Sequence, residues 1–321
     1  MNKLLMKFTF FTLLFFIADV DVAVAQQDKE CYLFTYFSDA DQSAGLHLAY
    51  SYDGLHWKAL NQGKPLLKPE VGNQKILRDP SITQGPDGTF HFVWTCSWAD
   101  KGIGYAHSKD LIHWSSQRYL PVMVDEKETQ YCWAPEIFYD DSTDRFYIIW
   151  ASTVTGKHDP VPHTEDEAYN NPRQYVTSTQ DFQTFTPSTK LYDKGFAVID
   201  AFPFKEGNTY YLFIKNENSL PAEKNIRIST ANSILGPYSE PSTPITSKSY
   251  WAEGASCLKV GDTYYLYYDR YKGEKGYGAK KSKDLKNWSD VTEQLQVPEG
   301  MKHGTPFKVS QKILNQLLQL E

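Results

Sequence analysis

The sequence predicts an all-β fold, and two patterns that recur along the chain carry this prediction. The first is a polar turn followed by an aromatic strand, as in "GPDGTFHFVWT" at residues 85–95. The second is a turn that ends in an aromatic residue, as in "SKDLIHW" up to Trp114. Each pattern occurs five times, and the two alternate in the same order. Four-stranded units repeated in this way are typical of a β-propeller, so we expect five blades.

The repeats set out where the strands are expected. The aromatic strands fall at residues 29–39, 85–95, 140–152, 205–216 and 260–270, the first of them without its preceding turn. The aromatic residues that end the second pattern are Trp57, Trp114, Phe185, Tyr238 and Trp288. Each unit is expected to hold about four short strands separated by turn signals. No sustained helical period of apolar residues appears before the C-terminal tail, which argues against helices elsewhere.

The two ends of the chain are expected to complete one blade together. Residues 28–66 supply the later strands of a blade but no first strand, whereas "KHGTPFKV" at residues 302–309 is a first strand with nothing after it. Pairing the two closes the ring and removes the exposed sheet edges of an open stack. The tail "SQKILNQLLQLE" then predicts a short amphipathic helix with Ile313, Leu314 and Leu317 facing inward.

The N-terminus has the composition of a secretory signal peptide. A short basic start precedes an apolar run that is too short to span a bilayer, and "AVAQ" offers a small-x-small cleavage site after Ala25. We therefore expect residues 1–25 to be removed and residues 26–321 to form a single propeller domain without a membrane span. The mature protein is expected to be exported, to the periplasm or the extracellular space.

Charge and cysteine content narrow the choice of partners. The formal net charge of −6 argues against nucleic acid or an anionic membrane surface, either of which favours a basic face. A neutral polymer remains open as a partner. The four cysteines, Cys31, Cys96, Cys132 and Cys257, match no metal-binding spacing. They allow three disulfide pairings, and buried free thiols are at least as well supported.

Acidic residues recur where the innermost strands should begin. These strands are expected to start at "LRDPSI", "CWAPEIF", "VIDAFPF", "WAEGASC" and "KHGTPF". Because innermost strands converge on the propeller axis, the residues at their starts gather at one mouth of the central channel. The residues expected at this mouth are Asp79, Glu136, Asp200, Glu253 and His303. Four acids held together repel one another, which is costly unless the repulsion has a use, so we interpret the cluster as functional.

Such a cluster suits the cleavage of glycosidic bonds. The reaction needs one carboxylic acid that donates a proton to the leaving oxygen and one carboxylate that activates water. A third acid helps, because a like charge raises the pKa of its neighbour. Trp98, Trp133 and Trp251 lie near the mouth and could stack on a sugar ring, although blade core is an equal alternative. Arg78 and Arg270 could bind sugar hydroxyls, although pairing with the acids is favoured.

The same motifs resemble a known enzyme family. "RDPSI", "WAPEI", "VIDAFPF", "WAEGAS" and "HGTP" are similar to glycoside hydrolase family 43, five-bladed propellers that act on arabinofuranosides and xylosides. The resemblance implies that Asp79 is the general base, Glu253 the general acid and Asp200 the residue that tunes and orients the acid. It implies that Glu136 supports substrate binding outside this trio. It places His303 at the axis, where family members often hold water or calcium, so a structural Ca²⁺ is possible although no cofactor is required.

Two departures from the family pattern leave the substrate open. Family members commonly have Asp-Pro where this chain has Asp200-Ala201, and Glu-Gly-Pro where it has Glu253-Gly254-Ala255. Neither change removes a carboxylate. The sequence therefore predicts an inverting, exo-acting α-L-arabinofuranosidase or β-xylosidase whose partner is an oligosaccharide or polysaccharide.

Two alternative functions remain at this point, together with an open question about one loop. A fructan-cleaving propeller also has "RDP", but its Asn-Asp-Pro-Asn and Glu-Cys motifs are absent here. A carbohydrate-binding propeller without catalysis is the second alternative, and the intact acids argue against it. The insertion at residues 154–174 makes the second blade the longest and is expected to form a loop over the mouth, or else a surface loop without a role.

Overall fold

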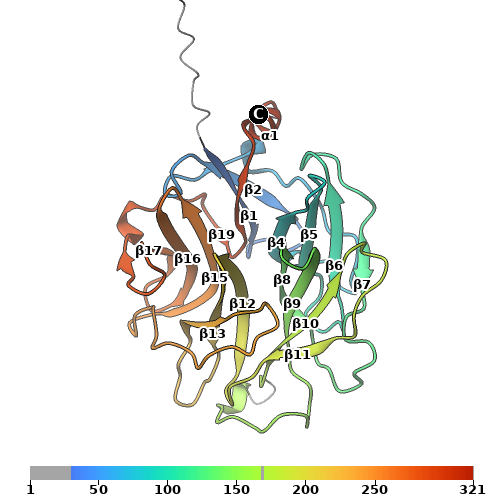
Figure 1. Cartoon of the computed structure of the whole chain (residues 1–321), viewed down its shortest axis with the longest axis vertical. Coiled ribbons are helices and arrows are strands. Elements are labelled where there is room, and N and C mark those ends of the chain that lie inside the picture. Colours follow the sequence, from blue (N-terminus) through green and yellow to red (C-terminus); the bar gives the residue numbers. More distant parts are fainter. Residues whose placement is uncertain (1–29, 168–169, 321) are drawn as a thin grey trace, which may run out of the picture.

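The protein forms five antiparallel sheets arranged around a central axis (Figure 1). The structure is a computed structural model that describes residues 30–167 and 170–320. The prediction of a five-bladed β-propeller is confirmed. The signal-peptide prediction falls on residues outside the described ranges. Among the described residues, no helix is both long enough and apolar enough to cross a membrane.

The strands of the first two blades follow one another along the chain. The first blade contains β4 (Arg78–Gln84), β5 (Phe90–Thr95), β6 (Ile103–Ser108) and β7 (Arg118–Leu120). The second contains β8 (Trp133–Asp140), β9 (Arg145–Ser152), β10 (Arg173–Thr179) and β11 (Thr189–Tyr192).

The third and fourth blades continue the series. The third contains β12 (Val198–Glu206), β13 (Thr209–Asn216) and β14 (Asn225–Ala231). The fourth contains β15 (Trp251–Val260), β16 (Thr263–Lys272), β17 (Gly276–Ser282) and β18 (Ser289–Asp290). In the described part of the chain, three short 3₁₀ helices lie in connections, at Asn61–Gly63, Glu165–Glu167 and Thr292–Gln294.

The fifth blade joins the two ends of the chain, as predicted. It contains β1 (Cys31–Ser38), β2 (His47–Ser51), β3 (Lys58–Ala59), β19 (Met301–Lys302) and β20 (Pro306–Val309). Strand β20 pairs antiparallel with β1, with Val309 opposite Cys31 and Pro306 opposite Phe34. The closing pair therefore supplies the inner strand that the N-terminal segment lacks.

The C-terminal helix α1 (Gln311–Leu318) packs as its amphipathic pattern predicts. The hydroxyl of Ser310 accepts the backbone N–H of Ile313 and caps the first turn. Leu314 and Leu317 are buried, and Ile313 packs against the same hydrophobic cluster. The helix thus covers the blade that closes the ring.

The third blade departs from the expected four strands. Its sheet has three, and segment 239–246 runs along the outer strand in place of a fourth. Ser239 and Ser242 donate their backbone N–H groups to the carbonyls of Thr230 and Ile228. Their hydroxyls accept the N–H groups of the same two residues. Serine side chains thus replace the carbonyls of a regular strand, so the edge is satisfied without a continuous ladder.

The recurring turns of the sequence are built on aspartate side chains. In "SKDLIHW", Asp110 accepts the backbone N–H groups of Ile112 and His113, which stabilises the turn in the manner of an Asx-turn. Four of the five copies use an aspartate in this way, namely Asp53, Asp110, Asp181 and Asp284.

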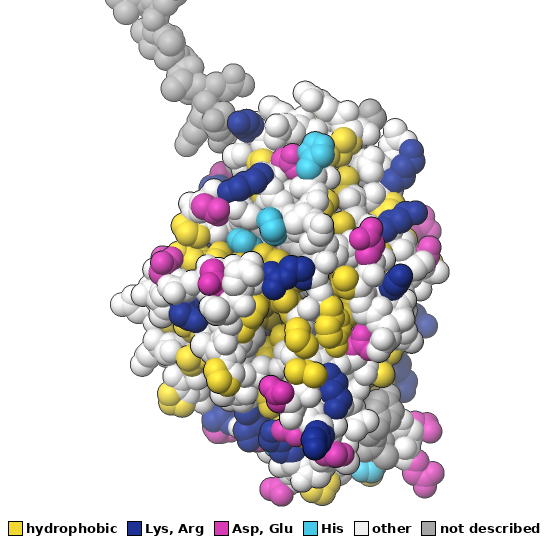
Figure 2. Space-filling model, turned by 90° about the vertical axis from the view of Figure 1, so that its right-hand side faces the viewer, with side chains coloured by type: hydrophobic (Ala, Val, Ile, Leu, Met, Phe, Trp, Pro, Cys, Tyr) yellow, Lys and Arg dark blue, Asp and Glu magenta, His cyan; other side chains and the backbone are white. Residues whose placement is uncertain are grey.

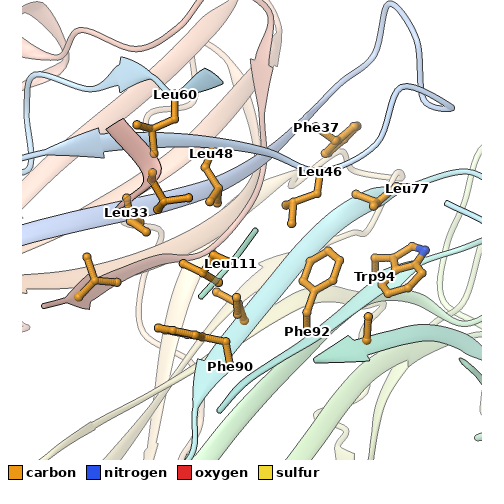
Figure 3. Close-up of a cluster of buried hydrophobic side chains, with 14 of the residues drawn as sticks. Leu33, Phe37, Leu46, Leu48, Leu60, Leu77, Phe90, Phe92, Trp94 and Leu111 are labelled. Atoms are coloured by element: carbon orange, nitrogen blue, oxygen red, sulfur yellow. The ribbon is translucent and has the colours of Figure 1, made fainter. Parts of the chain in front are cut away.

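Hydrophobic clusters fill the spaces between neighbouring blades. Figure 3 shows the cluster between the fifth and first blades, in which leucines of one face aromatic residues of the other. It includes Leu33, Leu46, Leu48, Phe90, Phe92 and Trp94. Cys96, Cys132 and Cys257 are buried free thiols, and Cys31 is buried as well. On the outside, the face near β7 and β11 carries scattered charges around a patch of hydrophobic side chains (Figure 2).

Candidate active site

Four of the inner strands begin with the same irregularity. In β4, β8, β12 and β15 the pairing register shifts within the first few residues, which marks a β-bulge. The residue in the bulge has a positive φ, and these residues are Asp79 (51°), Ala134 (46°), Asp200 (53°) and Gly254 (62°). This conformation is strained for residues other than glycine and is found where a side chain must be re-aimed. The bulges turn Asp79 and Asp200 into the axial mouth.

A cavity of about 320 Å³ opens at this mouth. Asp79, Asp200, Glu253 and His303 all line it, although they come from four different parts of the sequence. The inner strands that carry them converge near the centre of the molecule (Figure 1). Of the four carboxylates and one histidine expected in this space, three carboxylates and the histidine line the cavity, and Glu136 does not.

Asp79 forms an ion pair with His303. Oδ1 of Asp79 lies 3.3 Å from Nδ1 of His303, and Thr95 donates its hydroxyl to Oδ2 at 2.8 Å. Burial alone would raise the pKa of Asp79, but His303 and Arg78 outweigh it and lower the pKa to about 2. Burial would likewise lower the pKa of His303, but Asp79, Asp200 and Glu136 raise it to about 10. At neutral pH the pair is a carboxylate and an imidazolium.

The residues at the axis do not fit a metal ion. The ring nitrogens of His303 face Asp79 and Glu136, with Nε2 4.0 Å from Oε1 of Glu136. Ca²⁺ also requires several oxygen ligands around one point. Within residues 30–167 and 170–320, no three His, Cys, Asp or Glu side chains are grouped so as to hold a metal. His303 is held in this structure by its ion pair with Asp79.

Glu136 lies deeper than predicted and does not line the cavity of the mouth. It follows the bulge residue of its strand by two positions, so its side chain is set further along the axis. Ser81 and Thr305 donate their hydroxyls to its Oε2, and burial raises its pKa to about 8. Glu136 faces a separate cavity at the other end of the inner strands. This position does not support the assignment of Glu136 to substrate binding, and its Oε1 lies 4.0 Å from Nε2 of His303 instead.

Asp200 is tied to the strand that carries Glu253. Its Oδ2 accepts the backbone N–H of Gly254 at 2.8 Å. Gly254 must be glycine here, because a Cβ atom would lie 2.5 Å from Cγ of His303. Burial raises the pKa of Asp200, and the charges of Glu253 and Asp79 add to the rise. Asp200 is therefore placed to orient the segment next to Glu253.

Several charged residues of the cavity were missed because the sequence reading considered only the first strands, and Lys215 and Asp269 are the two that lie next to Glu253. Lys215 on β13 places Nζ 2.9 Å from Oε2 of Glu253. Asp269 on β16 lies opposite Glu253 in the strand pairing, and burial raises its pKa to about 7. A signal for both was present in the sequence. Thr95, Lys215 and Asp269 occupy the same position of the aromatic-strand repeat and all line the cavity.

The predicted aromatic residues reach the cavity. Trp98, Trp133 and Trp251 all line it, and Trp98 is the most open of the three, with 39% of its surface exposed. Trp98 and Trp133 meet edge to face, with ring centroids 5.7 Å apart. Trp133 also donates its Nε1–H to the carbonyl of Trp98. The two form one aromatic corner at the rim.

The two predicted arginines have different positions. Arg78 lines the cavity and donates to Asp39 at 2.6 Å, with its guanidinium over the rings of Phe37 and Trp98. Arg270 does not line the cavity and is bound instead to Glu274 at 3.1 Å. Because side chains alternate along a strand, the neighbour of Asp269 points to the opposite face. Arg270 therefore pairs with an acidic residue, the alternative that the sequence favoured, although this acid lies outside the cavity.

The insertion of the second blade contributes to the mouth. Glu167 and Asn170 line the cavity. Lys224, which is almost fully buried, places Nζ 2.6 Å from Oε2 of Glu167 and thereby ties the insertion to the third blade. The expected loop over the mouth is present.

Comparisons with known proteins show the family and the fold of the chain. A family model described as a probable glycosyl hydrolase domain, related to family 43, matches residues 27–314. No curated protein matches the sequence. The five-bladed fold and the family model define a class of propellers that cleave glycosidic bonds. Because the family model covers most of the chain, the protein belongs to this family-43-related group of glycosyl hydrolases.

Several solved structures share the fold at low sequence identity. A thermostable family-43 glycoside hydrolase has a TM-score of 0.51 at 16% identity, over 67% of this chain and 71% of that one. An α-L-arabinofuranosidase from Lactobacillus brevis has a TM-score of 0.50 at 19% identity, over 67% and 72% of the two chains. An exo-β-1,3-galactanase from Phanerochaete chrysosporium has a TM-score of 0.51 at 16% identity, over 67% and 49%. These likenesses establish the fold.

Proposed function

We propose that the protein hydrolyses the glycosidic bond of a terminal pentose, an α-L-arabinofuranoside or a β-D-xyloside, with inversion at the anomeric carbon. The observation that carries the proposal is the placement of Asp79, Asp200 and Glu253 around one cavity, with Asp79 held ionised by His303. The signal-like N-terminus adds the proposal that the enzyme is exported and meets its oligosaccharide or polysaccharide substrate outside the cytoplasm.

The three carboxyl groups take different parts in the reaction. Asp79 accepts a proton from a water molecule while the oxygen of that water bonds to the anomeric carbon. Protonated Glu253 donates its proton to the glycosidic oxygen as the carbon–oxygen bond breaks. Asp200 keeps the Glu253 segment in place through the N–H of Gly254. Proton exchange with solvent then returns both residues to their starting states.

The blade positions of the two acting residues favour inversion. Asp79 opens β4 in the first blade and Glu253 opens β15 in the fourth, and the fifth blade lies between these two around the ring. Inverting enzymes keep their carboxyl groups about 6.5–9.5 Å apart to leave room for water, whereas retaining enzymes bring them to about 5–5.5 Å. Residues from non-neighbouring blades suit the wider arrangement.

The shape of the cavity favours action on a chain end. Its volume of about 320 Å³ is at the lower limit for ligand pockets, which suits a short stretch of sugar. Glu167 and Asn170 of the insertion occupy part of its rim, held by Lys224. Trp98 offers an exposed aromatic face on which a sugar ring can stack.

The identity and configuration of the released sugar test the proposed function. We expect the mature protein to release arabinose or xylose from arabinan, arabinoxylan or the matching aryl glycosides. β-1,3-Galactan serves as the comparison substrate. Proton NMR of the first product, recorded before mutarotation, should show the anomer opposite to the bond cleaved. Release of galactose alone would reject the pentose proposal, and a retained anomer would reject inversion.

Substitutions of the two acting residues separate their roles. Glu253→Gln should abolish cleavage of natural linkages but spare aryl glycosides with very acidic leaving groups, which need little protonation. Asp79→Asn should abolish both activities, because the water still needs a base. Steady-state rates on matched aryl glycosides of differing leaving-group acidity measure the contrast. Equal residual activity of the two variants on the most activated substrate would remove the assignment.

A further inference from the structure

A row of alternating charges leads away from Glu253 into the third blade. Lys215 lies 2.9 Å from Oε2 of Glu253 and 2.7 Å from Oε2 of Glu217. Lys224 in turn lies 2.7 Å from Oε1 of Glu217 and 2.6 Å from Glu167. All five side chains line the cavity. The mechanism described above uses only Glu253 from this row.

The position of Lys215 opposes the role of Glu253 as an acid. Its side chain is almost fully buried, where charge interactions are stronger than in water. Burial would lower the pKa of Lys215, but Glu217 and Glu253 raise it well above its ordinary value. The ammonium of Lys215 attracts a carboxylate more strongly than it attracts the neutral carboxylic acid that the reaction requires.

Both positive and negative groups surround the carboxyl group of Glu253. The titratable or charged groups that face it from the surrounding strands are Arg78, Asp200, Lys215, Asp269 and Tyr271. Of these, Lys215 is the cation with a direct contact to the Glu253 carboxyl group. A second carboxylate that pairs with Lys215 therefore weakens the attraction between Lys215 and Glu253, and so influences proton donation by Glu253.

Glu217 is the second carboxylate that pairs with Lys215. It lies two residues beyond Lys215, its side chain is 9% exposed, and both of its oxygens lie 2.7 Å from a lysine. Asn170 from the insertion donates its side-chain amide to Oε1 of Glu217 at 3.1 Å and holds the carboxylate in place. Lys215 is consequently shared between two carboxylates, one of which has no other part in the reaction.

We propose that Glu217 is a positioning residue for proton donation: it shares the ammonium of Lys215 and so allows Glu253 to remain protonated in the resting enzyme. The inference rests on the proposed function, because it presupposes that Glu253 is the general acid. It adds a residue that the family motifs in the sequence do not include, and a reason for the buried lysine beside the acid.

The dependence on the leaving group tests this role. Glu217→Gln keeps the shape but leaves Lys215 unbalanced, so kcat/KM should fall on the order of tenfold or more for glycosides with poor leaving groups. For a dinitrophenyl glycoside the fall should stay within about threefold, since little protonation is needed. The alkaline limb of the pH profile should also move to lower pH. Glu217→Asp, which keeps the charge, should remain close to the wild type in the ratio of the two rates.

A double variant distinguishes an electrostatic role from a structural one. Lys215→Gln combined with Glu217→Gln removes both charges, so the ratio of rates should return toward the wild-type value. Glu223→Gln is the matched control, because Glu223 lies on the same connection but is bound to Asn225 and Arg227 away from the cavity. It should leave both rates unchanged.

The possible outcomes are separable from failure of the proposed function. If the wild type cleaves none of the glycosides, or if Glu253→Gln shows no dependence on the leaving group, the proposed function or the acid assignment fails. If those hold but Glu217→Gln slows both classes of substrate equally, or neither, the role of Glu217 is overturned. The same follows if the double variant does not recover the ratio. Thermal unfolding of each variant identifies losses that arise from misfolding.

Discussion

The axial mouth depends on buried charges that satisfy one another. His303 is 4% exposed and faces Asp79 through one ring nitrogen and Glu136 through the other. Buried ions are stable only when they are paired, because the interior solvates them poorly. The imidazolium therefore holds Asp79 ionised, which is the charge state that a general base needs.

The pairing of His303 predicts a dependence of stability on pH. Its pKa is raised from the ordinary 6.5 to about 10, so the folded state holds a proton that the unfolded chain releases. The stabilisation is complete below pH 6.5 and is lost as the pH rises toward 10. The difference in the free energy of unfolding between the wild type and His303→Gln should therefore shrink over this interval. Urea unfolding at several pH values measures it.

Glu136 adds to the same trend in the wild type. Its pKa rises from 4.5 to about 8, so the folded state again binds the proton more tightly than the unfolded chain. This term also lowers stability as the pH increases. A difference between wild type and His303→Gln that stayed constant from neutral to alkaline pH would show that the histidine is not charged in the folded protein.

At the scale of single strands, the bulges that open the inner strands decide where the side chains point. They place Asp79 and Asp200 in the left-handed region of φ, where a side chain carries strain. In β15 the equivalent position is Gly254, and Glu253 precedes it. Glu253 thus approaches the cavity from a different point of its strand than Asp79 does.

Gly254→Ala tests how tightly this element is built. Position 254 has a φ of 62°, and a Cβ atom would lie 2.5 Å from His303, so the substitution adds a steric clash to the backbone cost. Gly261→Ala, in the turn of the same hairpin, has a φ of 57° and no atom within 4 Å of the added carbon. The control should lose roughly 1–2 kcal/mol from backbone strain alone.

The Gly254 variant should lose a further 1–3 kcal/mol or so from overpacking, together with its activity. Chemical denaturation and steady-state rates of both variants provide the comparison. If the two lost equal stability and both retained activity, the close approach of Gly254 to His303 would have no role in the site.

At the scale of the whole molecule, the ring depends on a contact between residues at opposite ends of the chain. β20 supplies the inner strand of the fifth blade by pairing with β1. Without it, β1 exposes an unpaired edge at the centre of the propeller, and such edges promote aggregation. The same strand follows His303, so closure also completes the candidate active site.

Truncation after Pro298 should therefore abolish cooperative folding. The shortened chain lacks β19, β20 and α1 and is expected to aggregate or to remain unfolded. Truncation after Ser310 is the control, since it removes only α1 and the burial of Leu314 and Leu317, worth about 1.5–3 kcal/mol each. Thermal unfolding by circular dichroism compares them. A cooperative transition with an unchanged midpoint in the shorter protein would rule out closure by β20.

The sequence by itself determined the number of blades, the closure of the ring and the strands that carry the acids. These features follow from patterns within one repeat, such as the Asp110 turn and the aromatic strand after it, because turn chemistry and side-chain alternation act over a few residues. Similar positions in successive repeats, matched for Asp79 and Asp200 and one residue earlier for Glu253, then indicated one mouth for all three without knowledge of any contact.

Only the tertiary structure decided which side chains meet there. The depth of Glu136, the pairing of His303 with Asp79 and the contact of Lys215 with Glu253 each join residues from different blades. Such contacts depend on the bulges and on the curvature of the ring, which decide how deep along the axis each side chain lies. Local sequence patterns do not encode these shifts, because the energy that selects them is the mutual solvation of charges that are distant along the chain.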